Sequence, residues 1–138
     1  MTTNSAVIEV TLCTVEDIVL VRKKVRTFAQ TLGFGMADQT RLATAVSELA
    51  RNALQYASGG KCLVSDHSTL ETMVVRVQVS DSGPGIADIS WAMGDGYTSG
   101  QGMGVGLPGC KRLMDNFTIV STPDVGTTIT VEMHANRR

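Results

Sequence analysis

Two side chains that carry oxygen ligands lie one helical turn apart near the middle of the sequence. Glu48 and Asn52 are at positions i and i+4 of the segment 38–57, whose apolar residues recur at three- and four-residue steps, as in a helix. Both side chains lie on a helix face that borders the apolar stripe. A carboxylate there could orient or deprotonate a nucleophile, and an amide oxygen could hold Mg²⁺. A solvated helix surface, on which Glu48 pairs with Arg51, would explain the same residues without chemistry.

A second carboxylate, Asp81, ends a predicted strand and is followed by Gly83 and Gly85. It has the same parity as the apolar face of that strand, which consists of Met73, Val75, Val77 and Val79. Burying a carboxylate is costly unless a donor hydrogen-bonds to it. The exocyclic amine of a purine would be such a donor, and the glycines would let a flat ring approach closely. A simple turn that begins at Asp81 is the alternative.

Glycines alternate with other residues in a third segment, at Gly100, Gly102, Gly104 and Gly106. Such a run leaves backbone N–H groups unshielded, and a predicted helix over 103–116 begins within it. Together, the bare N–H groups and the helix N-terminus predict a cradle for phosphates. Flexibility without any ligand is the alternative, and the adjacent helix makes it the weaker one.

Two well-known glycine motifs match this segment only in part. Gly104, Gly106 and Gly109 fit GxGxxG, but a polar loop precedes them where the dinucleotide motif requires a buried strand. A Walker A loop would need Lys at the position of Cys110, and no Ser or Thr follows Lys111. We therefore interpret both matches as chance.

The elements around these residues predict an α+β fold. Apolar periodicity and turn residues indicate helices and strands in the order β-α-α-β-β-α-β-β, over the residues 7–13, 14–33, 38–57, 61–66, 70–81, 103–116, 117–121 and 127–133. This order suits a two-layer α/β sandwich, with a mostly antiparallel sheet and about three helices on one face. The long connection after Asp81 predicts a functional lid over about 86–102. We expect one domain over 1–138.

Composition excludes several classes of protein. The 138 residues carry a net charge of −1, so no basic surplus points to nucleic acid. No apolar stretch is long enough to cross a membrane, and the first residues lack the pattern of a signal peptide, so we expect a cytoplasmic protein. The three cysteines are far apart, and a metal site of Cys and His is not expected.

Taken in order along the chain, these features resemble the GHKL ATPase superfamily (HATPase_c, the Bergerat fold), which includes gyrase B, Hsp90, histidine kinases and MutL. The resemblance covers nearly the whole chain. Glu48–Asn52 resembles the N box of the family, Asp81–Gly85 its G1 box, and Gly100–Gly106 its G2 box. Gly126-Thr127 stands where the family has its last glycine–threonine element.

The resemblance implies a site for ATP and Mg²⁺. Asn52 would ligate Mg²⁺, Asp81 would receive the adenine amino group, and Glu48 would orient or deprotonate the acceptor hydroxyl as the catalytic residue. The remaining ATP-binding residues that it implies are Gly83, Gly85, Gly100, Gly102, Gly104, Gly106 and Thr127.

Within the superfamily, the chain is most similar to small bacterial kinases of the RsbT type. The similarity lies in the segments Asp95–Ser99 and Gly104–Asp115. It implies a serine/threonine kinase that phosphorylates a STAS-domain protein in a partner-switching (stressosome-like) pathway and binds a PP2C-type phosphatase activator when released. Two alternatives stay open: an anti-sigma factor of the RsbW/SpoIIAB type that sequesters a sigma factor, and a stand-alone ATPase domain like that of histidine kinases.

Overall fold

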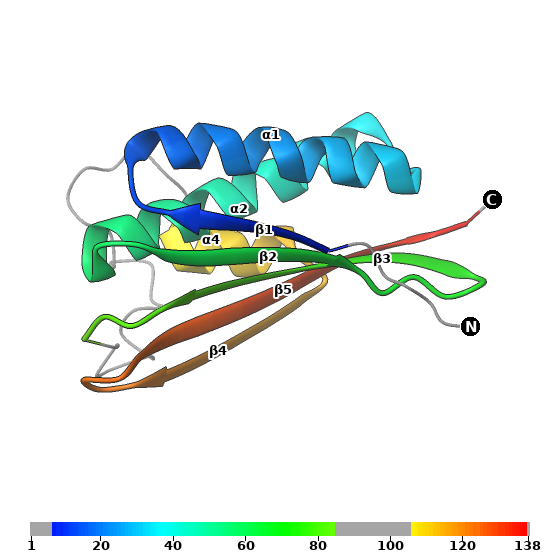
Figure 1. Cartoon of the computed structure of the whole chain (residues 1–138). Coiled ribbons are helices and arrows are strands. Elements are labelled where there is room, and N and C mark those ends of the chain that lie inside the picture. The colour runs from blue at the N-terminus through cyan, green and yellow to red at the C-terminus, as the bar shows by residue number, and fades with distance from the viewer. Residues whose placement is uncertain (1–6, 85–105, 138) are drawn as a thin grey trace.

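A five-stranded antiparallel sheet and three helices make up the part of the chain that the computed structural model describes, residues 7–84 and 106–137. The helices all cover one face of the sheet, and the other face is open (Figure 1). The strand order is β1-β2-β3-β5-β4. The elements are β1 (Val7–Leu12), α1 (Val15–Leu32), α2 (Met36–Ala57), β2 (Gly60–Asp66), β3 (Thr72–Asp81), α4 (Gly106–Leu113), β4 (Asn116–Thr122) and β5 (Gly126–Asn136).

The predicted fold class and the order of the elements are confirmed, and the predicted boundaries differ from the observed ones by up to three residues, as at the end of the third helix. The sequence predicts that the third helix continues to residue 116, but α4 ends at Leu113. The reason is the sheet: Asn116 already pairs with Glu132 in the β4–β5 register, and the backbone N–H of Asp115 donates to the Glu132 carbonyl at 2.9 Å. The proposed lid, 86–102, lies outside the described residues.

Helix α1 begins and ends at the residues that its sequence indicates. The carboxylate of Asp17 accepts hydrogen bonds from the backbone N–H groups of Cys13 and Thr14, at 2.8 and 3.0 Å, which satisfies donors at the helix start. Gly33 ends the helix in the left-handed conformation, with φ 108°. No helix within the described ranges is long and apolar enough to cross a membrane.

The core lies between the helices and the sheet, and the strand pair β3–β5 contributes the central side chains on the sheet side. Alternate residues of both strands are buried beneath α2, among them Val75, Val77, Ile129 and Val131. Because side chains alternate between the two faces of a strand, the last residue of β3 and the second residue of β5 extend this same face. These two residues are Asp81 and Thr127, which are opposite each other in the register.

Candidate functional site

Asp81 stands at the end of the core, where the apolar face of β3 gives way to a polar group. Its Oδ1 accepts hydrogen bonds from the backbone N–H of Gly83 at 2.9 Å and of Thr127 at 3.3 Å. Its Oδ2 accepts none from the described part of the chain. Since no buried side-chain oxygen or nitrogen in that part lacks a partner, Oδ2 is not fully buried. Asp81 is therefore held in place by one oxygen and presents the other.

Two glycines bring backbone close to this carboxylate. A Cβ atom on Gly83 would lie 2.3 Å from Cβ of Ala57, at the end of α2, so no side chain fits between the two segments. A Cβ atom on Gly126 would lie 2.1 Å from the carbonyl oxygen of Asp81, and Gly126 has φ 146°. The end of α2, the end of β3 and the start of β5 therefore meet at Asp81.

Thr127 is buried, with 6% of its surface exposed, and its hydroxyl is fixed from the neighbouring strand. Its Oγ1 lies 2.7 Å from Oγ of Ser121. Sequence analysis missed Ser121, although a signal was present. The turn between β4 and β5 runs from Pro123 to Val125, and a hairpin closed around it pairs Ser121 with Thr127, as the register has it.

Glu48 occupies an enclosed position between α2 and α4. Its side chain is 12% exposed and forms an ion pair with Arg51. Its Oε1 accepts a hydrogen bond from the backbone N–H of Gly106, at 3.4 Å, where α4 begins. The surface alternative was thus correct about the partner, Arg51, but wrong about the solvated setting. Glu48 lies beside the helix start that the glycine run leads into.

Helix α4 is held on α2 along its length. Cys110 donates from Sγ to the Ala45 carbonyl at 3.3 Å, and Arg41 donates to the Leu113 carbonyl at 3.0 Å. Burial, and secondarily the charge of Glu48, raises the pKa of Cys110 to about 12, so this thiol stays protonated and acts as a packing group. Nothing in the sequence indicated the contact of Arg41.

Asn52 lies on α2, one turn beyond Glu48 and before Ala57. It is half-buried, and its amide makes no hydrogen bond within residues 7–84 and 106–137. The last turns of α2 therefore connect the two halves of the site: Glu48 touches the start of α4, Ala57 touches Gly83, and Asn52 lies between them with its amide available. The other candidates, Gly85, Gly100, Gly102 and Gly104, lie outside the described residues.

Comparison with known proteins agrees with this architecture. Residues 37–137 match the family described as histidine kinase-, DNA gyrase B-, and HSP90-like ATPase. The chain is 44% identical over 113 residues to the serine/threonine-protein kinase RsbT of Bacillus subtilis, covering 82% of this chain and 85% of that one. It is 32% identical over 123 residues to an anti-sigma F factor of Bacillus velezensis, covering 84% and 83%.

A solved structure shares the fold. It holds the RsbU and RsbW domains of Rv1364c from Mycobacterium tuberculosis and superposes with a TM-score of 0.65 at 22% identity, covering 99% of this chain and 34% of that one. The chain therefore belongs to the family of histidine kinase-, DNA gyrase B- and HSP90-like ATPases, whose fold binds ATP. Its similarity to RsbT places it, more narrowly, among the serine/threonine kinases of that family.

Proposed function

We propose that this kinase transfers the γ-phosphate of ATP to a serine or threonine of a STAS-domain protein, and that it works by partner switching. When released from that protein, it would activate a PP2C-type phosphatase. The observation that carries the kinase proposal is the position of Glu48, an enclosed carboxylate next to the start of α4. The similarity to RsbT and to anti-sigma F factors supports the choice of a protein substrate.

In this proposal, Asp81 recognises adenine. Its open Oδ2 would accept a hydrogen bond from the exocyclic amine, while Oδ1 stays bound to the N–H groups of Gly83 and Thr127. The tight contact of Gly83 with Ala57 would shape one wall of the base pocket, with Gly85 beside it. A carboxylate already oriented by two backbone donors loses little freedom when the base arrives, which favours binding.

The phosphates would lie at the N-terminus of α4, where backbone N–H groups and the helix dipole favour anions. Gly106 begins this helix, and Gly100, Gly102 and Gly104 would complete the cradle beneath a lid over 86–102. The amide oxygen of Asn52 fits Mg²⁺, which typically takes one or two protein oxygens and completes its shell with phosphates and water. Bound Mg²⁺ would neutralise charge on the phosphates.

Glu48 would act on the acceptor hydroxyl. Its carboxylate would accept the hydroxyl proton as the hydroxyl oxygen bonds to the γ-phosphorus and the bond to the β-phosphate oxygen breaks, which leaves ADP and the phosphoprotein. Arg51, already paired with Glu48, would keep the carboxylate oriented before substrate binds. General-base catalysis of this kind contributes about 10²- to 10⁴-fold to the rate.

The test is a transfer assay with ATP, Mg²⁺ and purified STAS-domain proteins. We expect phosphate that is stable to acid and labile to base, as phosphoserine and phosphothreonine are. Glu48→Gln should keep ATP affinity and lower kcat by about 10²-fold or more. Glu71→Gln, which removes an exposed carboxylate of the β2–β3 connection, is the matched control and should behave as wild type. Normal kcat in Glu48→Gln would refute the role of Glu48.

The anti-sigma factor reading remains the second candidate, because the similarity to anti-sigma F factors covers most of both chains. Absence of transfer to every STAS protein, together with tight binding to a sigma factor, would favour it over the kinase. Phosphate that is labile to acid would instead indicate transfer to histidine.

A further inference from the structure

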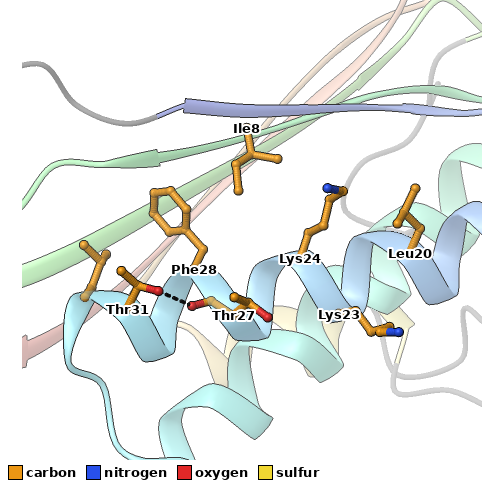
Figure 2. A pocket seen from close by; sticks show the side chains of 8 residues that line it. Ile8, Leu20, Lys23, Lys24, Thr27, Phe28 and Thr31 are labelled. Atoms are coloured by element: carbon orange, nitrogen blue, oxygen red, sulfur yellow. Dashed lines mark hydrogen bonds between the residues drawn. The ribbon is translucent and has the colours of Figure 1, made fainter.

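A groove runs along the outer side of α1, beneath the edge strand β1, away from the residues assigned to ATP. It encloses about 490 Å³ and is lined chiefly by Ile8, Leu20, Lys23, Lys24, Phe28 and Leu32. Figure 2 shows Ile8 pointing from β1 toward α1, while Leu20, Lys24 and Phe28 rise from α1 toward β1. Leu20 is 41% exposed. The groove is therefore an apolar trough with ammonium groups at its edge.

Positive charge is concentrated on the part of α1 that borders this trough, and two of the basic residues there, Lys23 and Lys24, line it, whereas Arg22 and Arg26 do not. Four of the 12 basic residues of the chain lie within residues 22–26, namely Arg22, Lys23, Lys24 and Arg26. None of the four forms an ion pair within the described part of the chain. Since the chain as a whole carries −1, this basic cluster is a local feature of α1. It complements an acidic surface.

The Leu20 end of the groove lies toward the end of the sheet that holds the proposed site of transfer. Leu12 at the end of β1 pairs with Gly60, and Gly60 packs on the carbonyl of Ser80, next to Asp81. The start of α1 thus lies at the same end of the sheet as Asp81. Leu20 is five residues beyond Val15, or about 8 Å along the helix at 1.5 Å per residue. A protein lying in the groove can extend a loop toward that end.

The chemistry of the groove argues against two other occupants. A nucleic acid duplex would use the ammonium groups, but it presents mainly charged phosphates, rather than an apolar side chain, to the trough between Ile8 and Phe28. A second copy packed symmetrically over this face would bring two basic clusters of the same sign close together. An acidic protein surface with an exposed apolar side chain satisfies both features of the groove.

We propose that the groove between α1 and β1 is the docking site for the protein substrate, through an acidic, amphipathic segment of that substrate. An apolar side chain of the segment inserts between Leu20, Phe28 and Ile8, and its carboxylates face Lys23 and Lys24. This inference rests on the proposed kinase function for the identity of the partner. It assigns substrate recognition to a surface separate from the ATP-binding residues.

The first experiment measures the kinetics of transfer to a STAS-domain protein. Lys24→Glu should raise KM for the protein about tenfold, since charge reversal at an interface replaces attraction by repulsion, and leave kcat and KM for ATP unchanged. Lys61→Glu makes the same charge change on β2, outside the groove, and should leave every constant unchanged. Equal KM values for both variants would overturn the proposal.

The apolar part of the groove is tested by Leu20→Ala. We expect KM for the protein to rise about fivefold, because a truncated side chain leaves the apolar contact incomplete. Leu70→Ala, which removes the same side chain from a position that is 94% exposed, should have no effect. The KM of wild type should also increase with ionic strength, and that of Lys24→Glu should increase less. A flat salt dependence in wild type would contradict the docking model.

Direct binding separates failure of this inference from failure of the proposed function. If wild type transfers no phosphate, titration of the same STAS protein by calorimetry, with ATP absent, still compares wild type with Lys24→Glu. Binding that Lys24→Glu weakens keeps the docking site, even though the kinase proposal has failed. No binding by wild type overturns both. A dimer detected by sedimentation that Leu20→Ala dissociates would assign the groove to a second copy and overturn the proposal. Binding of a 20-base-pair DNA duplex that Lys24→Glu abolishes would assign it to a nucleic acid and overturn the proposal as well.

Discussion

The carboxylates on the two faces of the β3–β5 strand pair differ in how many of their oxygens are hydrogen-bonded. On the open face, Glu132 lies opposite Arg76 and accepts its Nε and Nη2 groups at 2.7 Å each. Asn116 and His134 contact its other oxygen at 3.0 Å. On the helix face, Asp81 accepts two backbone N–H groups on one oxygen and none on the other within the described residues.

This difference separates a structural carboxylate from one available to a ligand. Burial alone would raise the pKa of Glu132, but hydrogen bonds from His134, Asn116 and Arg76, with the charge of Arg76, lower that pKa to about 2. Both of its oxygens are already satisfied. Asp81 has an accessible oxygen at the end of the core. Substitution of Glu132 should therefore change stability, and substitution of Asp81 should change binding.

The largest effect should come from Asp81→Asn. The amide keeps the shape of the carboxylate, but its NH₂ group would face the adenine amine, donor against donor. A hydrogen bond to a charged group contributes about 1.5–3 kcal/mol, so we expect ATP affinity to fall about 10- to 100-fold, measured by calorimetry. The thermal midpoint should stay close to that of wild type. Unchanged affinity would mean that Asp81 is not the adenine-binding residue.

The second effect concerns the close packing of Gly83 against the end of α2, on the helix face of the sheet. In Gly83→Ala, the new Cβ would overlap Cβ of Ala57 at 2.3 Å. We expect unfolding in urea to show a loss of about 1–3 kcal/mol, the usual cost of overpacking, together with weaker ATP binding. Gly35→Ala is the control for steric overlap, because nothing lies within 4 Å of its Cβ position and its cost is confined to the preference for Gly over Ala at the N-cap of α2. Equal stability of the two variants would contradict the close approach at Gly83.

The sequence predicted more of the helix-face site than of the open-face cluster, for physical reasons. Parity along β3 placed Asp81 on the core face, and the order of elements gave the α+β fold. These patterns depend on residues that are close in sequence, so they can be recognised without the tertiary structure. The contact of Gly83 with Ala57 and the bond from Arg41 to α4 depend on how helices sit on the sheet. The cluster around Glu132 depends on strand order, which brings β3, β4 and β5 together.

The third effect tests the open face through pH. Glu132→Gln should lower the free energy of unfolding at pH 7 by about 1–2 kcal/mol, because bonds to a charged group are lost, and should leave ATP affinity unchanged. A carboxyl whose pKa is lowered on folding stabilises the protein fully above its unfolded value of 4.5. That contribution declines as pH falls from 4.5 toward 2. In urea unfolding, wild type and variant should therefore converge as pH falls through this range. A difference in the free energy of unfolding that stays constant over this pH range would show that the lowered pKa of Glu132 is not the cause of the stabilisation.

The smallest effect comes from one substitution made on both faces of β5. Thr127 points to the helix face, where its hydroxyl lies 2.7 Å from Ser121, and Thr130 points to the open face, where it accepts from Gln78 at 3.3 Å. Each Thr→Val change removes a hydroxyl and keeps the shape. Thr127→Val should weaken ATP binding about threefold to tenfold, since a neutral hydrogen bond contributes about 0.5–1.5 kcal/mol. Thr130→Val should leave it unchanged. Equal loss in both variants would mean that strand stability, rather than the face of the sheet, controls binding.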